Sequence, residues 1–223
     1  MAGERLKSCE VGPLGIPADR GWALRDETTQ EITNGKKIPM LMHCAATYRT
    51  EPANGTIPHV EITLPDGSHV ASDDLNVNER LSDALQRKLT LWPRQPATNK
   101  SHYRRGSSAA RVMGQLLRTS SFRALLPQLT KLPNIDSQLR DAFSREAGEP
   151  IPDISNLPAE VLEFTSPLGT YFDAFPIHVL STASLEAMKQ FNPTAAWDVR
   201  RFRPNFLIES AAGIAGLTEP DWA

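Results

Sequence analysis

The sequence predicts a protein of the α+β class, mostly β with some α structure, in which a basic and partly helical segment joins two packed units. Three observations predict this class. Several short stretches alternate between apolar and polar residues, as strands with one buried face do. The 18 prolines are spread along the 223 residues, and proline disfavours long helices because it lacks an N–H donor. Apolar residues make up 40% of the chain, which is enough material for a buried core.

The charge and the distribution of apolar residues exclude several classes of protein. A net charge of -2 gives no general attraction to nucleic acid or anionic lipid, so we expect neither as a partner. Met1–Glu10 holds no apolar run, and the most apolar stretch, Ile38–Thr47, is far shorter than the roughly 20 residues that cross a bilayer. Cys9 and Cys44 are too few for a disulfide framework. We therefore expect a cytoplasmic protein without a membrane partner.

The first unit is expected to span residues 1–95. Its patterns predict, in order, a hairpin over 22–33, a strand within 41–49, a strand–turn–strand unit over 60–72, a helix over 76–88 and an extended segment over 89–92. The helix is predicted because apolar residues recur at helical spacing among charged residues, at Val77, Leu81, Ala84 and Leu85. This unit is thus mostly β with one amphipathic helix.

Residues 96–158 are expected to form a connector that is partly helical or flexible. Between Asn99 and Arg145 it carries nine lysine and arginine residues against two acidic ones, Asp136 and Asp141, which leaves a local charge of +7. One interpretation is a basic arm for nucleic acid or an acidic partner. The other is a solvated connector, since the segment contains no aromatic interleaving and no binding motif.

Residues 159–223 are expected to form the second unit. The hydroxyl residues within Ser181-Thr182-Ala183-Ser184 can cap the start of a helix, and Asn192-Pro193 ends that helix. Phe206-Leu207-Ile208 predicts the strand that follows it.

Three places hold polar residues that packing alone does not require. The turn before the first hairpin carries Asp19 and Arg20, either as an anion site, because a guanidinium grips phosphate or carboxylate with two bonds, or as a local ion pair. Asp173 lies among aromatic residues, either as a desolvated acid or as a turn residue that caps amides. Period-two alternation would place Arg201, Arg203 and Asn205 on one face, either as donors for an anionic ligand or as a charged edge strand.

Other chemistry finds little support. The sequence has no glycine-rich phosphate loop and no nucleophile elbow, and its five histidines occur singly, without zinc-motif spacing.

Two pairs of segments resemble a known family. GIPADRGWALRDETTQEIT followed by KKIPMLM resembles the N-terminal β-barrel domain that precedes MOSC domains, the module named for the C-terminal part of molybdenum cofactor sulfurase. FPIHVLSTASLEAMKQFNP with WDVRRFRPNFLIES resembles the opening of the MOSC domain itself. The resemblance implies two β-barrel-like units, the second incomplete, that hold a molybdenum–pterin cofactor between them. It implies a protein of oxidoreductase type with a redox partner, and the family is also associated with pyridoxal phosphate binding.

The same resemblance implies roles for individual residues. Arg20 and Arg203 would bind the phosphate or pterin of the cofactor with Asn205 beside them, and Asp173 matches a further cofactor-contacting position. Two departures weaken the expectation of catalysis. The Lys-Ser pair that family members carry on their first strand is not matched, because Lys7-Ser8 lies in a different context. The cysteine that supplies sulfur to molybdenum has no counterpart either, so we expect a chain truncated at both ends and an impaired enzyme.

Two other classes of function remain open on the sequence. The basic segment could make the protein a non-enzymatic binding module. Alternatively, the chain could be a sulfur-carrying relative of the sulfurase C-terminal domain, which would need a reactive cysteine at position 9 or 44.

Overall fold

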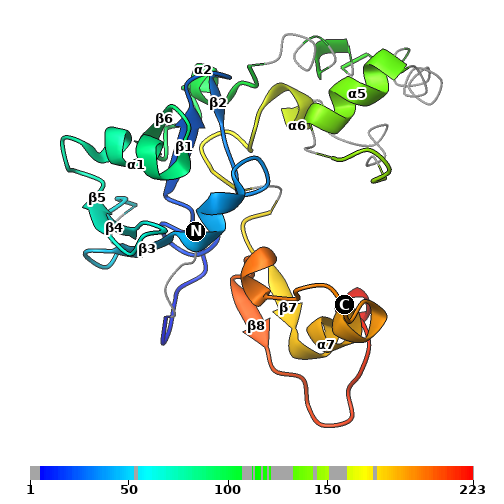
Figure 1. Cartoon of the computed structure of the whole chain (residues 1–223). Coiled ribbons are helices and arrows are strands. Elements are labelled where there is room, and N and C mark those ends of the chain that lie inside the picture. The colour runs from blue at the N-terminus through cyan, green and yellow to red at the C-terminus, as the bar shows by residue number, and fades with distance from the viewer. Residues whose placement is uncertain are drawn as a thin grey trace.

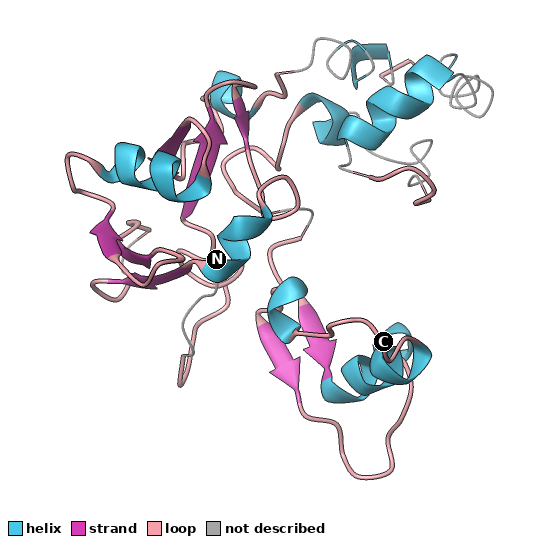
Figure 2. Ribbon diagram, viewed as in Figure 1, coloured by secondary structure: helices cyan, strands magenta, loops and turns pink. Residues whose placement is uncertain are grey.

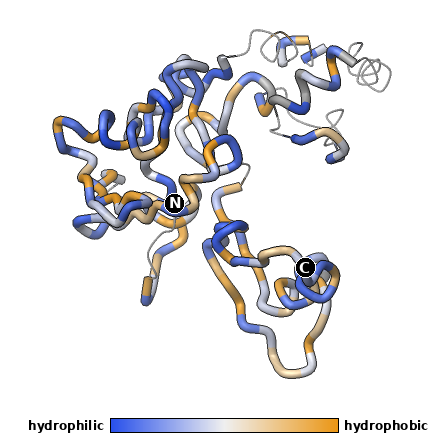
Figure 3. Tube along the Cα trace, in the orientation of Figure 1, coloured by the Kyte–Doolittle hydropathy of each residue, from blue (hydrophilic) through white to orange (hydrophobic). Residues whose placement is uncertain are grey.

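The computed structural model describes residues 6–52, 55–106, 112, 114–116, 118–119, 121, 133–142, 145–150, 160–172 and 175–222. Helices make up 26% and strands 19%, so the chain is α+β, with a larger helical share than the mostly β prediction implied. In this part of the chain no helix has the length and apolar character needed to cross a bilayer. Apolar residues recur at intervals along the trace instead of forming one long run (Figure 3).

The elements follow one another in the order shown in Figure 1. They are β1 (Trp22–Asp26), β2 (Glu31–Ile32), the 3-10 helix η1 (Pro39–His43), β3 (Ala45–Tyr48), β4 (Val60–Thr63), β5 (His69–Ala71), α1 (Val77–Leu85), β6 (Leu89–Pro93), α2 (Lys100–Tyr103), α5 (Pro133–Ala142), α6 (Glu160–Glu163), β7 (Val179–Ser181), α7 (Thr182–Phe191), η2 (Val199–Arg201), β8 (Phe206–Ile208) and η3 (Glu219–Asp221).

Two antiparallel sheets of three strands each build the first part of the chain. One has the order β2-β1-β6 and the other β3-β4-β5. The predicted hairpin over 22–33 and the strand–turn–strand unit over 60–72 are both confirmed. The extended segment over 89–92 is confirmed as β6, which pairs along the whole of β1, from Trp22 opposite Pro93 to Asp26 opposite Leu89.

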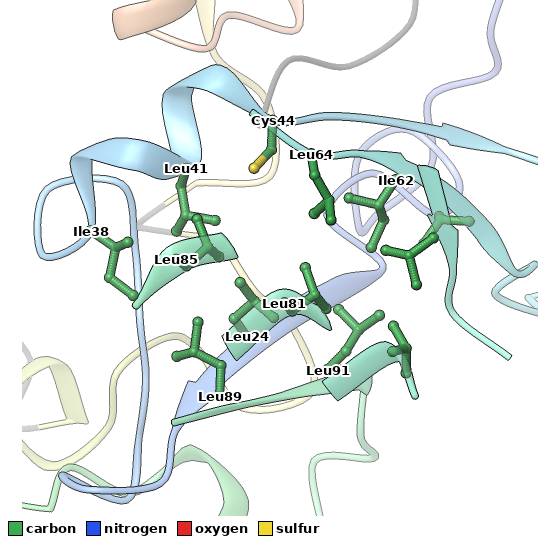
Figure 4. Packing of buried hydrophobic residues seen from close by; sticks show 13 residues of the cluster. Leu24, Ile38, Leu41, Cys44, Ile62, Leu64, Leu81, Leu85, Leu89 and Leu91 are labelled. Carbon is green, nitrogen blue, oxygen red and sulfur yellow. The ribbon is translucent and has the colours of Figure 1, made fainter. Parts of the chain in front are cut away.

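Helix α1 packs against β5 and β6 and so connects the two sheets (Figure 2). Val77, Leu81 and Leu85, three of the four residues that the helical spacing predicted, are buried, and the fourth, Ala84, is partly buried against the core. Leu81 is fully buried, and burial of a leucine contributes about 1.5–3 kcal/mol. Thirteen buried residues between Leu24 and Leu91 form one core cluster, drawn in Figure 4. This core supports β1, the strand that follows the Asp19-Arg20 turn.

The strand predicted within 41–49 is confirmed as β3. It begins only at Ala45, because Pro39 starts a 3-10 helix in which the amide of Leu41 donates to the Ile38 carbonyl. The predicted helix over 76–88 ends at Leu85, since Gln86 adopts the left-handed conformation with φ of 52°.

The connector is described only in part, and its residues 122–132 and 151–159 lie outside the described residues. Several of its described cations lie beside carboxylates. Arg118 is 2.9 Å from Glu163, and Arg140 is 2.7 Å from Asp136. Backbone bonds from Arg105 to Glu163 and from Thr165 to Tyr103 join the start of the connector to the residues that follow it.

The last part of the chain contains a strand–helix–strand unit. β7 and β8 are parallel, with Val179 opposite Phe206, and α7 is the crossover between them. Ser181 caps α7 by accepting a 3.0 Å hydrogen bond from the amide of Ser184, and the helix ends before Asn192, which confirms the predicted helix. The predicted strand at 206–208 is also confirmed. In Figure 1 this unit lies apart from the two antiparallel sheets.

Candidate functional site

The turn before β1 is tightly constrained. Gly12 and Gly15 exchange two backbone hydrogen bonds of 2.9 Å, and the amide of Asp19 donates to the Ile16 carbonyl. The Tyr48 hydroxyl donates to the Ala18 carbonyl at 2.6 Å, which anchors the turn on β3. The geometry therefore fixes the backbone from which the next residue, Arg20, projects.

Arg20 sits in a sparsely populated backbone conformation with φ of 50°, and Ala18 has φ of 59°. Such left-handed residues other than glycine cost of order 1–3 kcal/mol each and cluster at functional sites. The side chain of Arg20 is only 11% exposed. Its Nε lies 3.9 Å from Asp19 Oδ2, and its guanidinium carbon lies 5.9 Å from the centre of the Phe172 ring. A carboxylate and an aromatic ring thus flank the partly buried cation.

The segment around Arg203 differs from the prediction. Alternation placed Arg201, Arg203 and Asn205 on one face of a strand, but residues 199–201 form the 3-10 helix η2 and Arg203 has φ of 52°. The Asp198 carboxylate starts this helix by accepting from the amide of Arg200 at 2.8 Å. A helical turn followed by a left-handed residue has no two-residue repeat, so the predicted shared face does not exist.

Arg20 and Arg203 nevertheless line one cavity of about 110 Å³. The first half of the chain contributes Trp22 and Thr33 to its wall, and the second half contributes Tyr171 and Phe172. Phe172 is buried, whereas Arg203 is exposed. The cavity therefore combines two guanidinium groups with aromatic surface and is built by residues far apart in the sequence.

A buried aromatic cluster holds the cavity wall at Tyr171. The Tyr171 hydroxyl donates to the Pro93 carbonyl at 3.0 Å and lies 2.8 Å from His102 Nε2. Because that hydroxyl has a single proton, His102 Nε2 is the donor in the second bond. Burial lowers the pKa of His102, with a smaller effect from Arg25, and burial raises the pKa of Tyr171. Both groups therefore stay neutral near pH 7.

Thr33 adds an uncommitted polar atom to the wall. Its Oγ1 is buried, and among the described residues it has no hydrogen-bond partner. An unsatisfied buried hydroxyl costs about 1–3 kcal/mol.

The other predicted residues have different positions. Asn205 lies outside the cavity lining but bonds to Asp19, whose carboxylate Oδ2 accepts from Asn205 Nδ2 at 2.8 Å. Asp173 lies outside the described residues. The structure thus brings Arg20 and Arg203 together at one cavity and joins Asn205 to the turn that carries Arg20.

The cavity suits a small anion better than a metal ion. Two cationic forks can share the charge of a phosphate or carboxylate, and aromatic walls can cover a planar group. In the part of the chain that the structure describes, no three His, Cys, Asp or Glu side chains gather as metal ligands. Cys44 is buried in the core of the first sheets and Cys9 is exposed, and neither lines the cavity.

The sequence did not predict the other residues of the cavity wall as contributors to the site, among them Trp22, Thr33, Tyr171 and Phe172. Trp22 directly follows the Asp-Arg turn, and Tyr171 and Phe172 precede the acid that drew attention to their segment. Adjacency to a predicted site residue was therefore the available signal for three of them. No such signal in the sequence pointed to Thr33, because only the pairing of β1 with β2 brings this residue near the turn.

Comparisons of the chain with protein-family models, with curated proteins and with solved structures each found no match. The interpretation of the cavity therefore rests on its own residues.

Proposed function

We propose that this chain is a MOSC-type protein that binds the phosphate-bearing end of a molybdenum–pterin cofactor in the cavity between Arg20 and Arg203. The observation that supports it most is that the resemblance named these two arginines from opposite ends of the chain, and both line one cavity. On this proposal the sheets β2-β1-β6 and β3-β4-β5 correspond to the family's first β-barrel-like unit. The unit β7–α7–β8 corresponds to the opening of the second, incomplete one.

The residues present suit one end of the cofactor. Two guanidinium groups match the charge of a phosphate, and the aromatic residues Trp22 and Tyr171 add apolar surface beside which a flat heterocycle could lie. When bound, the cofactor would supply two-electron redox chemistry at its metal. The described residues offer no ligand cluster for that metal, so we derive no redox step from them.

The arrangement implies a division of work between the two arginines. Arg20 is mostly buried and lies against Phe172, so it would form the fixed floor of the anion site. Arg203 is exposed and would meet the anion at the mouth. A charge-assisted hydrogen bond is worth about 1.5–3 kcal/mol, so each arginine would contribute at least about tenfold to affinity.

Expression in a host that produces the cofactor provides the test. Molybdenum and released pterin should copurify with the wild type and be lost from Arg20→Ala and from Arg203→Ala. Arg201→Ala is the matched control, since it removes one exposed cation from the same segment without touching the cavity. Absence of pterin from the wild type, or its retention in both cavity variants, would overturn the proposal.

A further inference from the structure

The side-chain amide of Asn205 connects two segments that are far apart in the sequence. Its Oδ1 accepts from the amide of His178 at 2.9 Å, and its Nδ2 donates to Asp19 Oδ2 at 2.8 Å. This orientation of the amide is required chemically, because a backbone N–H cannot accept and a carboxylate cannot donate. The bond at Oδ1 therefore reaches the start of the strand–helix–strand unit, and the bond at Nδ2 reaches the turn before β1.

On the Asp19 side of the Asn205 side chain, the hydrogen bond acts on Arg20 through the adjacent residue, Asp19. Asp19 Oδ2, the oxygen that accepts from Asn205, is also the oxygen 3.9 Å from Arg20 Nε. The turn is closed by its own backbone bonds and by Tyr48. Because the turn is one rigid piece, a bond to the Asp19 carboxylate sets where the turn and Arg20 lie relative to the segment that carries Arg203.

On the His178 side, the contacts of Asn205 bear on Arg203, which lies two residues before it in the sequence. The backbone N–H of Asn205 donates to the His178 carbonyl at 2.8 Å, and His178 Nδ1 donates to the Phe202 carbonyl at 2.9 Å. These bonds lie on either side of Arg203, whose φ is 52°. Fixing Asn205 consequently fixes the backbone from which the second guanidinium projects.

We propose that Asn205 is a positioning residue that holds the Arg20 turn and the Arg203 segment in register, so that both guanidinium groups face one anion. The inference rests on the proposed anion site, but it assigns Asn205 a role other than direct contact with the ligand. Asn205 lies outside the cavity lining, which agrees with that role. A direct contact and a tether predict different results when the amide and its partner are exchanged.

The test uses inorganic phosphate as the probe, titrated calorimetrically into the full chain, with thermal unfolding recorded for every variant. Asn205→Ala removes the tether without changing charge and should weaken phosphate binding about tenfold. Asn205→Asp should weaken it at least as much, because two carboxylates would then face each other. Asp19→Asn keeps an acceptor for Asn205 Nδ2 but removes the negative charge beside Arg20, so it is the reference with which the exchanged pair is compared.

The exchanged pair, Asp19→Asn with Asn205→Asp, decides between the two roles. The new amide at 19 can donate to the new carboxylate at 205, which still accepts from the amide of His178, so the tether is restored. We expect its affinity for phosphate to return to within about threefold of that of Asp19→Asn. A direct contact predicts continued loss, because a carboxylate would then face phosphate, and that result would overturn the proposal.

The two proposals fail separately. If Arg20→Ala and Arg203→Ala leave phosphate binding unchanged, the anion site itself is wrong. If both abolish binding while Asn205→Ala does not weaken it, the site stands and the tether is wrong. Because the exchanged pair restores a hydrogen bond, it keeps the test decisive even if Asn205→Ala folds poorly.

Discussion

Gly15 lies so close to Pro176 that a Cβ atom at residue 15 would come within 2.6 Å of the Pro176 carbonyl oxygen. Gly15 also has φ of 81°, which L side chains rarely adopt. This contact is a second link between the turn that carries Arg20 and the second half of the chain, beside the bond from Asn205 to Asp19. The glycine of the turn is therefore required by both its conformation and its neighbour.

Gly15→Ala should accordingly weaken phosphate binding and destabilise the fold by more than the conformational cost alone, which is about 1 kcal/mol. Gly67→Ala is the matched control, because Gly67 has φ of 83° but an added Cβ would meet nothing within 4 Å. Chemical denaturation of both variants measures the difference. Equal losses of stability would show that the approach to Pro176 is unimportant.

Leu81→Ala should lower the free energy of unfolding by about 2–5 kcal/mol, because Leu81 is fully buried between the two antiparallel sheets and its loss leaves a cavity. Leu75, just before the same helix, is fully exposed, so Leu75→Ala should change stability by less than about 0.5 kcal/mol. Urea denaturation followed by circular dichroism compares them. A similar effect of both variants would show that Leu81 does not lie in a packed core.

Glu219 gives the second unit a dependence on pH. Burial alone would raise the pKa of its carboxyl, but hydrogen bonds from the Ser184 hydroxyl and the Ser181 amide lower it from 4.5 to about 2. A carboxyl group whose pKa is lower in the folded than in the unfolded protein stabilises the fold at pH values above the unfolded pKa. That stability is lost as pH falls from 4.5 towards about 2.

Glu219→Gln should therefore cost about 1 kcal/mol at pH 7 and flatten the acid limb of the stability curve. Glu209→Gln is the control, since Glu209 is an exposed acid of the same unit. Thermal unfolding between pH 2 and 7 tests both. An unchanged acid limb in Glu219→Gln would show that this carboxylate does not hold the C-terminal segment on α7.

The two thiols should differ sharply in reactivity. Burial raises the pKa of the Cys44 thiol, and this residue is 1% exposed, whereas Cys9 is exposed. An aromatic disulfide reagent should label one thiol rapidly in the folded protein, and Cys9→Ser should abolish that phase. Rapid labelling of Cys44 would contradict its burial. Any sulfur-carrying role of a cysteine in the folded chain would consequently fall on Cys9.

Local patterns in the sequence were enough to predict the hairpins, α1 and the capped start of α7. Each of these depends on residues within a few positions of one another, such as Val77 with Leu81, or Ser181 with the amide of Ser184. The alternation predicted at 201–205 was wrong. A capping bond from Asp198 and a left-handed Arg203 replace the strand there, and period-two spacing carries no information about either.

The arrangement of the site was decided by the tertiary structure. Residue types suggested that Arg20 and Arg203 bind an anion, but their meeting at one cavity depends on contacts between distant segments, including Asn205 with Asp19 and Gly15 with Pro176. Composition and periodicity report which residues a segment can bury or expose. They carry no information about which remote backbone accepts a given hydrogen bond, because that choice is made only when the whole chain packs.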